Sequence, residues 1–342
     1  MMKAMRYHGS GQLRLDEIDI PHVGPDDVLL APQAVGVCGT DAHIVSGHFP
    51  SNPPVVLGHE VCATVAGLGA DVRNLEEGDL VTVEPHLYCG SCTYCRIGKQ
   101  HMCPGKQAPG VHLDGGMAEY LVVPQHIAFK LPEGTSPQHG AMTEPLACCT
   151  HAMDRLEPRS GLPLVIFGCG PAGSMLIGLA KLSGLGPIIA IDPKPSRQRL
   201  ARNMGADVVL EPGDDLDDRI MELTDGLGAP YVVDAVGSAP VLENAIRVAS
   251  RAARILVFGV ADPHATASIR PNEIFTKELT LLGTAINPFT HHRAMHLLRR
   301  LPLDTWTSAS YPLDDLEGAL REQAAGEVDK VFIAPQATGV QA

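Results

Sequence analysis

Short apolar runs separated by turn-forming residues characterise the first 150 residues. Four such runs cover residues 28–37, 61–66, 80–84 and 119–123, and the stretches between them are rich in Gly and Pro. Short strands with frequent turn signals are typical of a compact, irregular β domain whose loops carry the polar side chains. The hydrophobic pattern therefore predicts a β-rich domain over residues 1–150.

After about residue 150, apolar runs alternate with segments of helical length. The predicted strands are Leu164–Phe167, Ile188–Ile191, Asp207–Leu210, Tyr231–Asp234, Arg254–Phe258 and Leu279–Leu282. The predicted helices between them are Pro171–Ser183, Pro195–Met204, Leu216–Thr224 and Pro240–Ala249. This alternation is typical of a doubly wound parallel sheet, so we predict an α/β protein whose second domain has that architecture. In the last stretch we predict a helix over Leu313–Ala324 and a strand over Lys330–Ile333.

The length and charge of the chain narrow the possible partners. At 342 residues the chain is long enough for two domains, each with its own core. Its 26 Lys and Arg against 39 Asp and Glu give a formal net charge of −13, which repels nucleic acid and anionic membrane surfaces. The N-terminus lacks the apolar stretch of a signal peptide, and Gly and Pro interrupt the longest apolar runs. We therefore expect a cytoplasmic protein without nucleic-acid or membrane partners.

Four cysteines lie in one short polar segment with C-x2-C-x2-C-x7-C spacing. They are Cys89, Cys92, Cys95 and Cys103. Such short gaps let the backbone fold back and present all four thiolates to one tetrahedral Zn²⁺. Two disulfides are the alternative, but nothing in the sequence suggests secretion, and adjacent C-x2-C pairs are awkward to bridge. The segment therefore predicts a structural zinc site.

The strand predicted at Leu164–Phe167 runs directly into a G-x-G-x-x-G sequence that opens a helix. The loop consists of Gly168, Cys169, Gly170, Pro171, Ala172 and Gly173. The first glycine permits the tight turn, the second lets the backbone approach a pyrophosphate, and the third lets the helix pack closely on the strand. Because helix N-termini bind anions, the loop predicts a dinucleotide site.

Asp192 ends the next predicted strand, about where a ribose-binding acid belongs. A carboxylate there accepts hydrogen bonds from the two ribose hydroxyls and repels a 2′-phosphate, which favours NAD over NADP. Lys194 and Arg197 follow closely and could weaken that discrimination, and an ordinary surface acid at the strand end is the alternative interpretation. We predict NAD as the cofactor, with Asp192 and Arg197 among the residues that bind it.

Two further fragments contain metal-ligand residues: C-G-T-D-A-H from Cys38 to His43, and G-H-E from Gly58 to Glu60. A zinc held by Cys38, His59 and Glu60 has three protein ligands and one open position, as a Lewis-acid site requires. Such a site lowers the pKa of an alcohol, and Thr40 and His43 are candidates to carry the proton away. Each fragment alone is weak, because a lone cysteine is usually core and a His-Glu pair is usually surface. Spacing alone also does not bring the two fragments together.

The combination of these fragments resembles the zinc-dependent medium-chain alcohol dehydrogenases, specifically the branch of polyol (sorbitol-like) and threonine dehydrogenases. The resemblance covers nearly the whole chain. It rests on V-C-G-T-D-A-H at 37–43, L-G-H-E at 57–60, the four-cysteine segment, T-E-P-L-A at 143–147, and the glycine loop with its acid.

The resemblance implies a GroES-like catalytic domain over residues 1–150, with a structural zinc lobe at about 86–105. It further implies a Rossmann NAD-binding domain over 151–285 and a C-terminal return to the catalytic domain over 286–342. Two zinc ions per chain, NAD in a cleft between the domains, and a homodimer or homotetramer are also implied. In the family, two segments flank the nicotinamide. The residues of this chain that match them are Val236-Gly237 and Thr284-Ala285-Ile286.

The third ligand of the reactive zinc differs between branches of the family. Other alcohol dehydrogenases use a cysteine where this chain has Glu144, and their G-H-E glutamate is not a ligand. The polyol-like branch uses the G-H-E glutamate itself, with the later glutamate near or intermittently on the metal. The resemblance therefore implies Cys38, His59 and Glu60 as ligands, with Glu144 as an additional one. Cys148 is a rival ligand, because zinc prefers sulfur and nitrogen donors.

We predict the reversible, zinc- and NAD-dependent oxidation of a secondary alcohol of a small polyol or sugar alcohol to the ketose. An amino-alcohol substrate, as in threonine dehydrogenase, is the alternative within the enzyme class. A non-catalytic zinc- and nucleotide-binding relative is the alternative from another class, since fold alone does not determine function. The intact ligand set, together with Thr40 and His43, argues against that second alternative.

Overall fold

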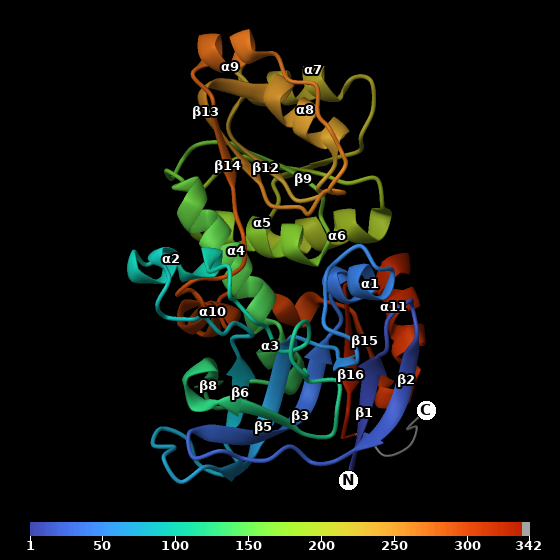
Figure 1. The fold of residues 1–342 in the computed structure, drawn as a ribbon. Coiled ribbons are helices and arrows are strands. Elements are labelled where there is room, and N and C mark those ends of the chain that lie inside the picture. The colour runs from blue at the N-terminus through green and yellow to red at the C-terminus, as the bar shows by residue number, and fades with distance from the viewer. Residues whose placement is uncertain (337–342) are drawn as a thin grey trace. The chain divides into compact units, whose positions relative to one another are not determined.

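The computed structural model describes residues 1–336, and the chain divides into two compact units. Unit 1 comprises Met1–Ala147, Pro288–Arg299 and the chain from Thr307 onward, and unit 2 comprises Cys148–Asn287 and Arg300–Trp306. The first strands and the last strands both belong to unit 1, as the blue and red ribbons of Figure 1 show. Residues 337–342, the end of the predicted C-terminal return, lie outside the described residues.

A seven-stranded sheet forms the centre of unit 1. Its path runs β15-β16-β3-β5-β6-β8, and β7 pairs with the first part of β3. The strands are β3 (Asp27–Gly36), β5 (Glu60–Leu68), β6 (Leu80–Val83), β7 (Leu121–Pro124), β8 (Ala128–Lys130), β15 (Ser308–Pro312) and β16 (Lys330–Ala334). Because β16 pairs antiparallel with β3, the end of the described chain completes the sheet that its beginning starts.

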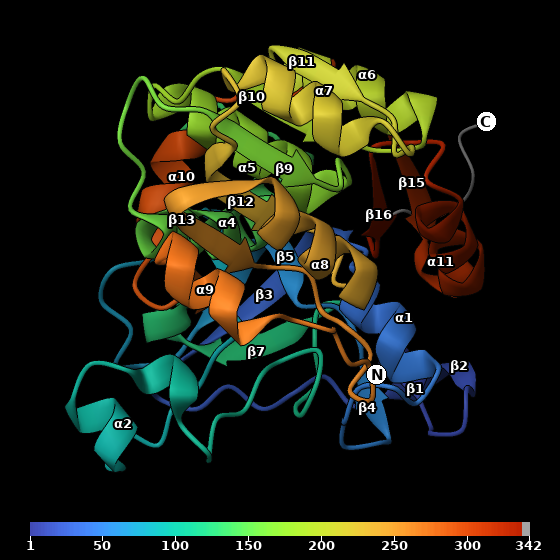
Figure 2. The same ribbon diagram turned by 90° about the horizontal axis from the view of Figure 1, so that it is seen from above.

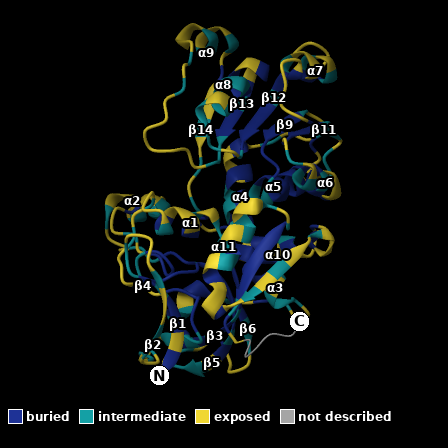
Figure 3. Ribbon diagram, turned by 90° about the vertical axis from the view of Figure 1, so that its right-hand side faces the viewer, coloured by how far each residue is buried: buried dark blue, intermediate teal, exposed yellow. Residues whose placement is uncertain are grey.

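A three-stranded sheet in the order β2-β1-β4 and several short helices complete unit 1. The strands are β1 (Met2–Tyr7), β2 (Leu13–Ile18) and β4 (Val55–Val56). The helices are α1 (Gly39–Val45), α2 (Thr93–Arg96), α3 (Pro137–Ala141), α10 (His291–Leu298) and α11 (Leu316–Ala325), with 3₁₀ turns η1 (Gln100–Met102), η2 (Gln125–Ile127) and η4 (Leu313–Asp315). A core of buried side chains, mainly Val, Leu and Ile, lies between these elements, and Figure 3 colours the buried residues of the strands dark blue. Burial of this apolar surface is the main stabilising contribution to the unit.

Unit 2 is built on a six-stranded parallel sheet in the order β11-β10-β9-β12-β13-β14. The strands are β9 (Leu164–Phe167), β10 (Ile188–Ile191), β11 (Val208–Leu210), β12 (Ala229–Asp234), β13 (Ala249–Val257) and β14 (Thr280–Gly283). The helices are α5 (Pro171–Leu182), α6 (Pro195–Met204), α7 (Leu216–Leu223), α8 (Ala239–Val248) and α9 (Pro271–Lys277), with the 3₁₀ turn η3 (Leu303–Thr305). Figures 1 and 2 show α5 and α6 on one face of the sheet and α7, α8 and α9 on the other. Helix α4 (Thr143–Leu156) begins in unit 1 and ends in unit 2.

A β-rich unit and a doubly wound parallel sheet confirm the predicted α/β class. Two strands and one helix of unit 2 have the predicted bounds, and the other predicted strands and helices differ by a few residues. Helix α9 was not predicted. Strand β13 begins five residues before the predicted Arg254, because a register shift lets Ala249 pair with Ala229. No helix in residues 1–336 has both the length and the hydrophobicity of a membrane-spanning segment.

Residues 300–306 lie in unit 2, although the sequence analysis placed them in the C-terminal return to the catalytic domain. Two contacts explain this position. The side chain of Leu301 packs over Gly178, where an added Cβ would lie 2.6 Å from Leu301 Cδ2. The indole N–H of Trp306 donates to the sulfur of Met204 at 3.2 Å. Residues 286 and 287 also belong to unit 2, so the return begins at Pro288.

Candidate metal and dinucleotide sites

Cys38, His59 and Glu60 come together at one end of the β3–β5 pair. Cys38 follows β3 and is the N-cap of α1, and His59 and Glu60 stand where β5 begins. The pairing of Gly36 with Glu60 fixes this register. One donor atom from each side chain lies within 4.8 Å of the other two, and all three donors are shielded to a large degree from solvent. Sheet pairing therefore unites the two fragments that sequence spacing left apart.

The start of α1 is held by reciprocal hydrogen bonds around Cys38. The sulfur of Cys38 accepts the Thr40 N–H at 3.5 Å, and Asp41 Oδ2 accepts the Cys38 N–H at 2.9 Å. This is a capping box in which a thiol takes the place of the usual hydroxyl. The hydroxyl oxygen of Thr40 also lies 3.6 Å from the Cys38 sulfur. The cap therefore fixes both the thiol and the hydroxyl beside it.

Asp41 is fully buried and faces His59. Its Oδ1 lies 3.6 Å from His59 Nδ1, which leaves the other ring nitrogen of His59 available as a metal ligand. Burial lowers the pKa of His59, but the Asp41 carboxylate and the Cys38 thiol raise it by more, so the pKa lies well above its ordinary value. A carboxylate behind a metal-binding histidine orients the ring and makes it a stronger ligand. Asp41 has the position for that role.

Glu60 is enclosed by a lysine and a glycine. Lys330, the first residue of β16, lies 2.6 Å from Glu60 Oε2 through its ammonium nitrogen, and both side chains are almost completely buried. A Cβ on Gly36 would collide with the same oxygen, so only glycine fits there. Burial lowers the pKa of Lys330, but Glu60, Cys38 and Asp41 raise it by more, so the lysine is charged.

The donor set fits zinc. A thiolate, an imidazole and a carboxylate are the ligand types that Zn²⁺ accepts, and three of them leave a position for a further ligand. Asp41 and Lys330 supply the outer partners that such sites usually have. Thr40 lies beside the thiol, whereas His43 is exposed on the surface of α1, with its ring centroid 6.5 Å from that of His48.

Two further candidate ligands from the sequence, Glu144 and Cys148, are not part of the close group that Cys38, His59 and Glu60 form among residues 1–336. Glu144 is buried in the first turn of α4, and its charge affects the pKa of Glu84, the residue that follows β6. Burial and then the charge of Glu144 raise the pKa of Glu84 to about 7.

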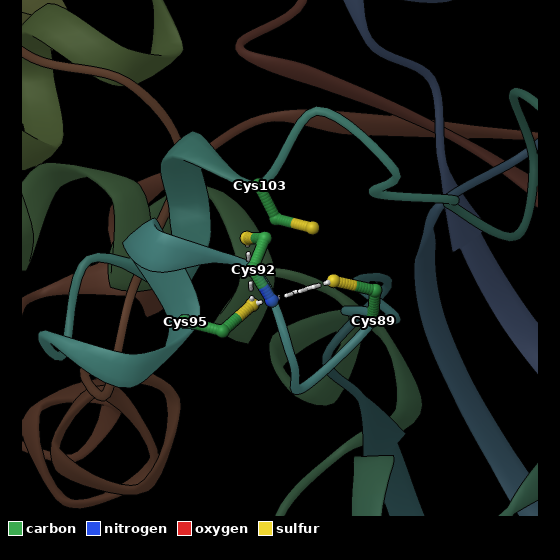
Figure 4. A group of neighbouring side chains, drawn as sticks. All are labelled: Cys89, Cys92, Cys95 and Cys103. Atoms are coloured by element: carbon green, nitrogen blue, oxygen red, sulfur yellow. Dashed lines mark hydrogen bonds between the residues drawn. The ribbon is translucent and has the colours of Figure 1, made fainter.

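The four cysteines of the lobe point toward one another, as Figure 4 shows. Their sulfurs all lie within 4.8 Å of one another, and the Cys92–Cys95 and Cys89–Cys95 separations are 3.5 and 4.0 Å. Sulfurs placed 2.3 Å from a tetrahedral zinc are about 3.8 Å apart. Backbone hydrogen bonds from Ser91 and Cys92 lower the pKa of Cys89 to about 6, whereas desolvation and the adjacent thiols raise that of Cys95 to about 12. A cation between them favours all four thiolates at once, so the lobe fits a closed zinc site.

The glycine loop has the geometry that close packing requires. Gly168 has a φ of +92°, and an added Cβ would lie 2.8 Å from Val236 Cγ2. A Cβ on Gly173 would collide with the carbonyl oxygen of Gly168, so the helix meets the strand there without room for a side chain. Gly170 is the N-cap of α5, and a Cβ added there would lie 4.0 Å from the guanidinium carbon of Arg197, so the space beside it is open. Pro171 and Ala172 begin the helix, and no side chain at the N-cap accepts a hydrogen bond from its first N–H groups.

Asp192 lies at the end of β10 and is tied to this loop. Its carboxylate accepts the N–H of Cys169 at 2.8 Å and that of Lys194 at 2.9 Å, and Arg197 Nη1 lies 3.8 Å away. Only 2 % of Asp192 is exposed. Asp192 is therefore not the ordinary surface acid of the alternative interpretation. Its carboxylate and the guanidinium group of Arg197 lie beside each other at the end of the strand.

The predicted nicotinamide-flanking residues lie at the carboxyl ends of β12 and β14. Val236 is half exposed, and its N–H donates to Asp234 Oδ1 at 2.9 Å. Ile286 has a φ of +48°, which is unfavourable for a β-branched residue. Thr284 Oγ1 and both side-chain amide atoms of Asn287 are buried without a hydrogen-bond partner among residues 1–336. Leaving such buried polar atoms unpaired costs about 1–3 kcal/mol each, so we expect a water molecule or a ligand to pair with them.

Sequence reasoning did not identify Asp41, Lys330, Gly36 or Asn287 as part of these sites. Asp41 was missed because the fragment that contains it was considered only for its Cys, Thr and His residues. Its position three residues after the N-cap is nevertheless a capping-box signal. Lys330 gave no signal, because a lysine at the start of an apolar run is normally a strand-end surface residue.

Comparisons with known proteins agree with this geometry. Residues 24–133 match the family model of the alcohol dehydrogenase GroES-like domain, and residues 171–300 match that of the zinc-binding dehydrogenases. The chain is 35% identical to the L-threonine 3-dehydrogenase of Pyrococcus horikoshii over 97% of both chains. It is 31% identical to the sorbitol dehydrogenase of Halalkalibacterium halodurans over 98% of this chain and 99% of the other.

A crystal structure of a protein from Sinorhizobium meliloti, described as a zinc-binding dehydrogenase and bound to NADP, has the same fold. It superposes with a TM-score of 0.92 at 36% identity, and the match covers 98% of this chain and 99% of that chain. Matches of this length and identity extend well beyond a shared fold. The chain therefore belongs to the zinc-dependent medium-chain alcohol dehydrogenases, in the branch of polyol and threonine dehydrogenases, and is a nicotinamide-dependent alcohol dehydrogenase.

Proposed function

We propose that this enzyme oxidises a secondary alcohol of a small polyol or sugar alcohol to the ketose, reversibly, with NAD and zinc. The observation that carries the proposal is the convergence of Cys38, His59 and Glu60 within 4.8 Å beside a threonine hydroxyl. The glutamate in this group, in place of a second cysteine, is the pattern that the sequence shares with the polyol-like branch.

Cys38, His59 and Glu60 hold the catalytic zinc in this proposal, with Glu144 as an additional or transient ligand from the start of α4. When bound, zinc supplies a Lewis acid for the substrate hydroxyl, and the dinucleotide supplies the hydride acceptor. Thr40, whose oxygen lies 3.6 Å from the Cys38 sulfur, would relay the hydroxyl proton by accepting it as it gives up its own. His43, on the exposed side of α1, passes that proton to solvent. The second zinc of the chain is held by Cys89, Cys92, Cys95 and Cys103.

NAD is held by unit 2. The α5 N-terminus and the Gly170 backbone meet the pyrophosphate, and Asp192 accepts the ribose hydroxyls through the lone pairs that its two backbone bonds leave free. Arg197 lies along the same ribose. At the nicotinamide end, Val236, Thr284 and Ile286 line the ring, and the unpaired atoms of Thr284 and Asn287 are complementary to a carboxamide, which both donates and accepts hydrogen bonds.

A second candidate substrate is an amino alcohol of the L-threonine type. Two observations support it. The Pyrococcus horikoshii relative, at 35% identity over 97% of both chains, is an L-threonine 3-dehydrogenase. In addition, the charge of Glu144 helps to raise the pKa of Glu84, and a substrate ammonium group near these two carboxylates would weaken that repulsion.

Initial rates on tetritols, pentitols, hexitols and L-threonine, each with NAD and with NADP, test the proposal. We expect the highest kcat/KM for a polyol with NAD. A highest value for L-threonine would instead support the second candidate, and Glu84→Gln would then lower that value much more than the value for a polyol. Absence of turnover on every alcohol, with zinc and NAD bound, would contradict both candidates. A preference for NADP would indicate that Arg197 binds the 2′-phosphate of the cofactor.

We further propose a homodimer or homotetramer that works in the reducing cytoplasm. Strand β14 is an edge strand of the unit 2 sheet, and Thr280, Leu281 and Gly283 on it are exposed. An exposed, uncharged edge strand favours pairing with a second copy. Within residues 1–336, which include all nine cysteines, no disulfide is formed, and the lobe needs its four cysteines in the reduced state. Light scattering of the purified protein tests the assembly, and Leu281→Lys should shift it toward the monomer.

A further inference from the structure

The last strand of the described chain places a buried lysine against the Cys38–His59–Glu60 group. Lys330 is 3 % exposed. Its ammonium nitrogen lies 2.6 Å from Glu60 Oε2 and donates a hydrogen bond to the carbonyl oxygen of Val37 at 3.0 Å. Val37 is the residue directly before Cys38. One side chain from the end of the chain therefore connects both segments that carry the proposed metal ligands.

Stability alone does not account for this ion pair. Lysine is almost never found this deeply buried without a partner, and removing two charges from water costs more than their attraction often returns. Replacing a buried ion pair by two apolar residues of similar size commonly leaves the protein as stable as before or makes it more stable. A buried pair at this position therefore calls for a role in what Glu60 does.

The surroundings of Glu60 leave its two oxygens unequal. Oε2 lies between the Lys330 ammonium group and the backbone of Gly36, where even a Cβ would not fit. Oε2 is therefore paired with the Lys330 ammonium group, and the Glu60 side chain has no room to turn toward Gly36. Oε1 is the oxygen that remains for another partner.

We propose that Lys330 is a positioning residue that reserves Oε2 of Glu60, so that Glu60 offers a metal ion one oxygen only. A carboxylate that binds zinc through both oxygens fills a further coordination position, which the substrate hydroxyl needs. Lys330 also balances the charge of the group. Cys38, Asp41 and Glu60 carry three negative charges when ionised, and Lys330 with one Zn²⁺ carries three positive charges. This inference rests on the proposed catalytic metal at Cys38, His59 and Glu60.

Cobalt substitution tests the role of Lys330 without relying on activity. Four-coordinate Co²⁺ absorbs visible light strongly, and five-coordinate Co²⁺ absorbs weakly. The spectrum of the Cys38 site is recorded as the difference from a Cys38→Ala protein, whose four-cysteine lobe is unchanged. In Lys330→Met we expect Co²⁺ to bind, with a loss of visible intensity, and turnover of the zinc form to fall by about 10- to 100-fold. Lys181→Met, which removes an exposed lysine 2.8 Å from Asp207, is the matched control and should change neither property.

The double variant Glu60→Gln/Lys330→Met shows whether the lysine acts through Glu60. It has no unpaired buried charge at this position, so it remains informative if Lys330→Met alone fails to fold. Adding Lys330→Met to Glu60→Gln should leave the cobalt spectrum unchanged, because no carboxylate oxygen remains to be reserved. A further change in the double variant, or an unchanged spectrum in Lys330→Met, would overturn the proposal for Lys330. A wild-type spectrum identical to that of Cys38→Ala would instead remove the catalytic metal, and with it the proposed function.

Discussion

Replacing Asp41 by Asn tests the electrostatic support of the proposed catalytic metal. Asp41 is fully buried, caps α1 through the Cys38 N–H at 2.9 Å, and lies 3.6 Å from His59 Nδ1. Asparagine keeps an oxygen for the Cys38 N–H, so the cap survives and only the charge is lost. Asp41→Ala would in addition lose the cap, at a cost of about 0.5–2 kcal/mol.

The magnitude follows from the role of such a carboxylate. Removing an outer partner of a metal-binding histidine typically lowers metal affinity about 10- to 100-fold, which corresponds to about 1.4–2.7 kcal/mol. A second effect has the opposite sign. Asp41 raises the pKa of His59, so a proton competes with the metal near neutral pH, and Asp41→Asn weakens that competition. The loss of affinity should therefore be larger at pH 9, where fewer protons compete with the metal for His59, than at pH 7.

Competition with a chelator measures this affinity at both pH values, with the four-cysteine site acting as an internal reference in the same protein. Asp218→Asn, an exposed acid on α7, is the matched control and should bind zinc like the wild type. Equal zinc affinities for Asp41→Asn and the wild type at pH 9 would refute the reasoning. A loss of zinc from the four-cysteine site as well would show that the substitution had damaged the fold.

Three further predictions concern other parts of unit 1. Burial lowers the pKa of His291 to about 3, below its ordinary value of 6.5, so the unfolded chain binds the extra proton and stability falls as the pH falls through that range. Between pH 7 and 5 this costs about 2 kcal/mol, and urea unfolding of His291→Gln should lack that loss. Gly36→Ala should displace Glu60 and reduce turnover, whereas Gly67→Ala, whose Cβ would lie 3.6 Å from Leu29 Cβ, should not; equal kcat/KM values would argue against the tight fit. Cys103→Ser should lower the zinc content by one ion per chain and lower the Tm in calorimetry, and an unchanged metal content would contradict the structural site.

The parallel sheet of unit 2 was the most predictable part of the fold. Strands β9 and β10 are continuous apolar runs because both of their faces are buried, and such runs stand out in a sequence. Helix α6 has its predicted bounds because Pro195 opens it and Gly205 ends it with a left-handed φ of +105°. Helix α4 was not predicted, since the stretch from Thr143 was interpreted only as a family motif.

The candidate site was predictable where its chemistry lies within one fragment, and not where pairing between distant strands creates it. The four-cysteine lobe is local, so spacing was enough to predict it. The approach of Cys38 to His59 depends on the register of β3 and β5. The approach of Lys330 depends on a strand 293 residues after Val37, and its charge gives no indication of burial. A charged side chain is buried only where it has a partner, and a single sequence does not reveal which distant residue that partner is.

The central claim, that Cys38, His59 and Glu60 hold a catalytic zinc distinct from the zinc of the cysteine lobe, is tested most directly by Cys38→Ala. The measurement is the number of zinc ions per chain, together with NAD binding and alcohol-dependent NAD reduction in the same preparation. We predict two zinc ions in the wild type and one in the variant, with NAD still bound and turnover lost. Two zinc ions and near-normal turnover in Cys38→Ala would contradict the account.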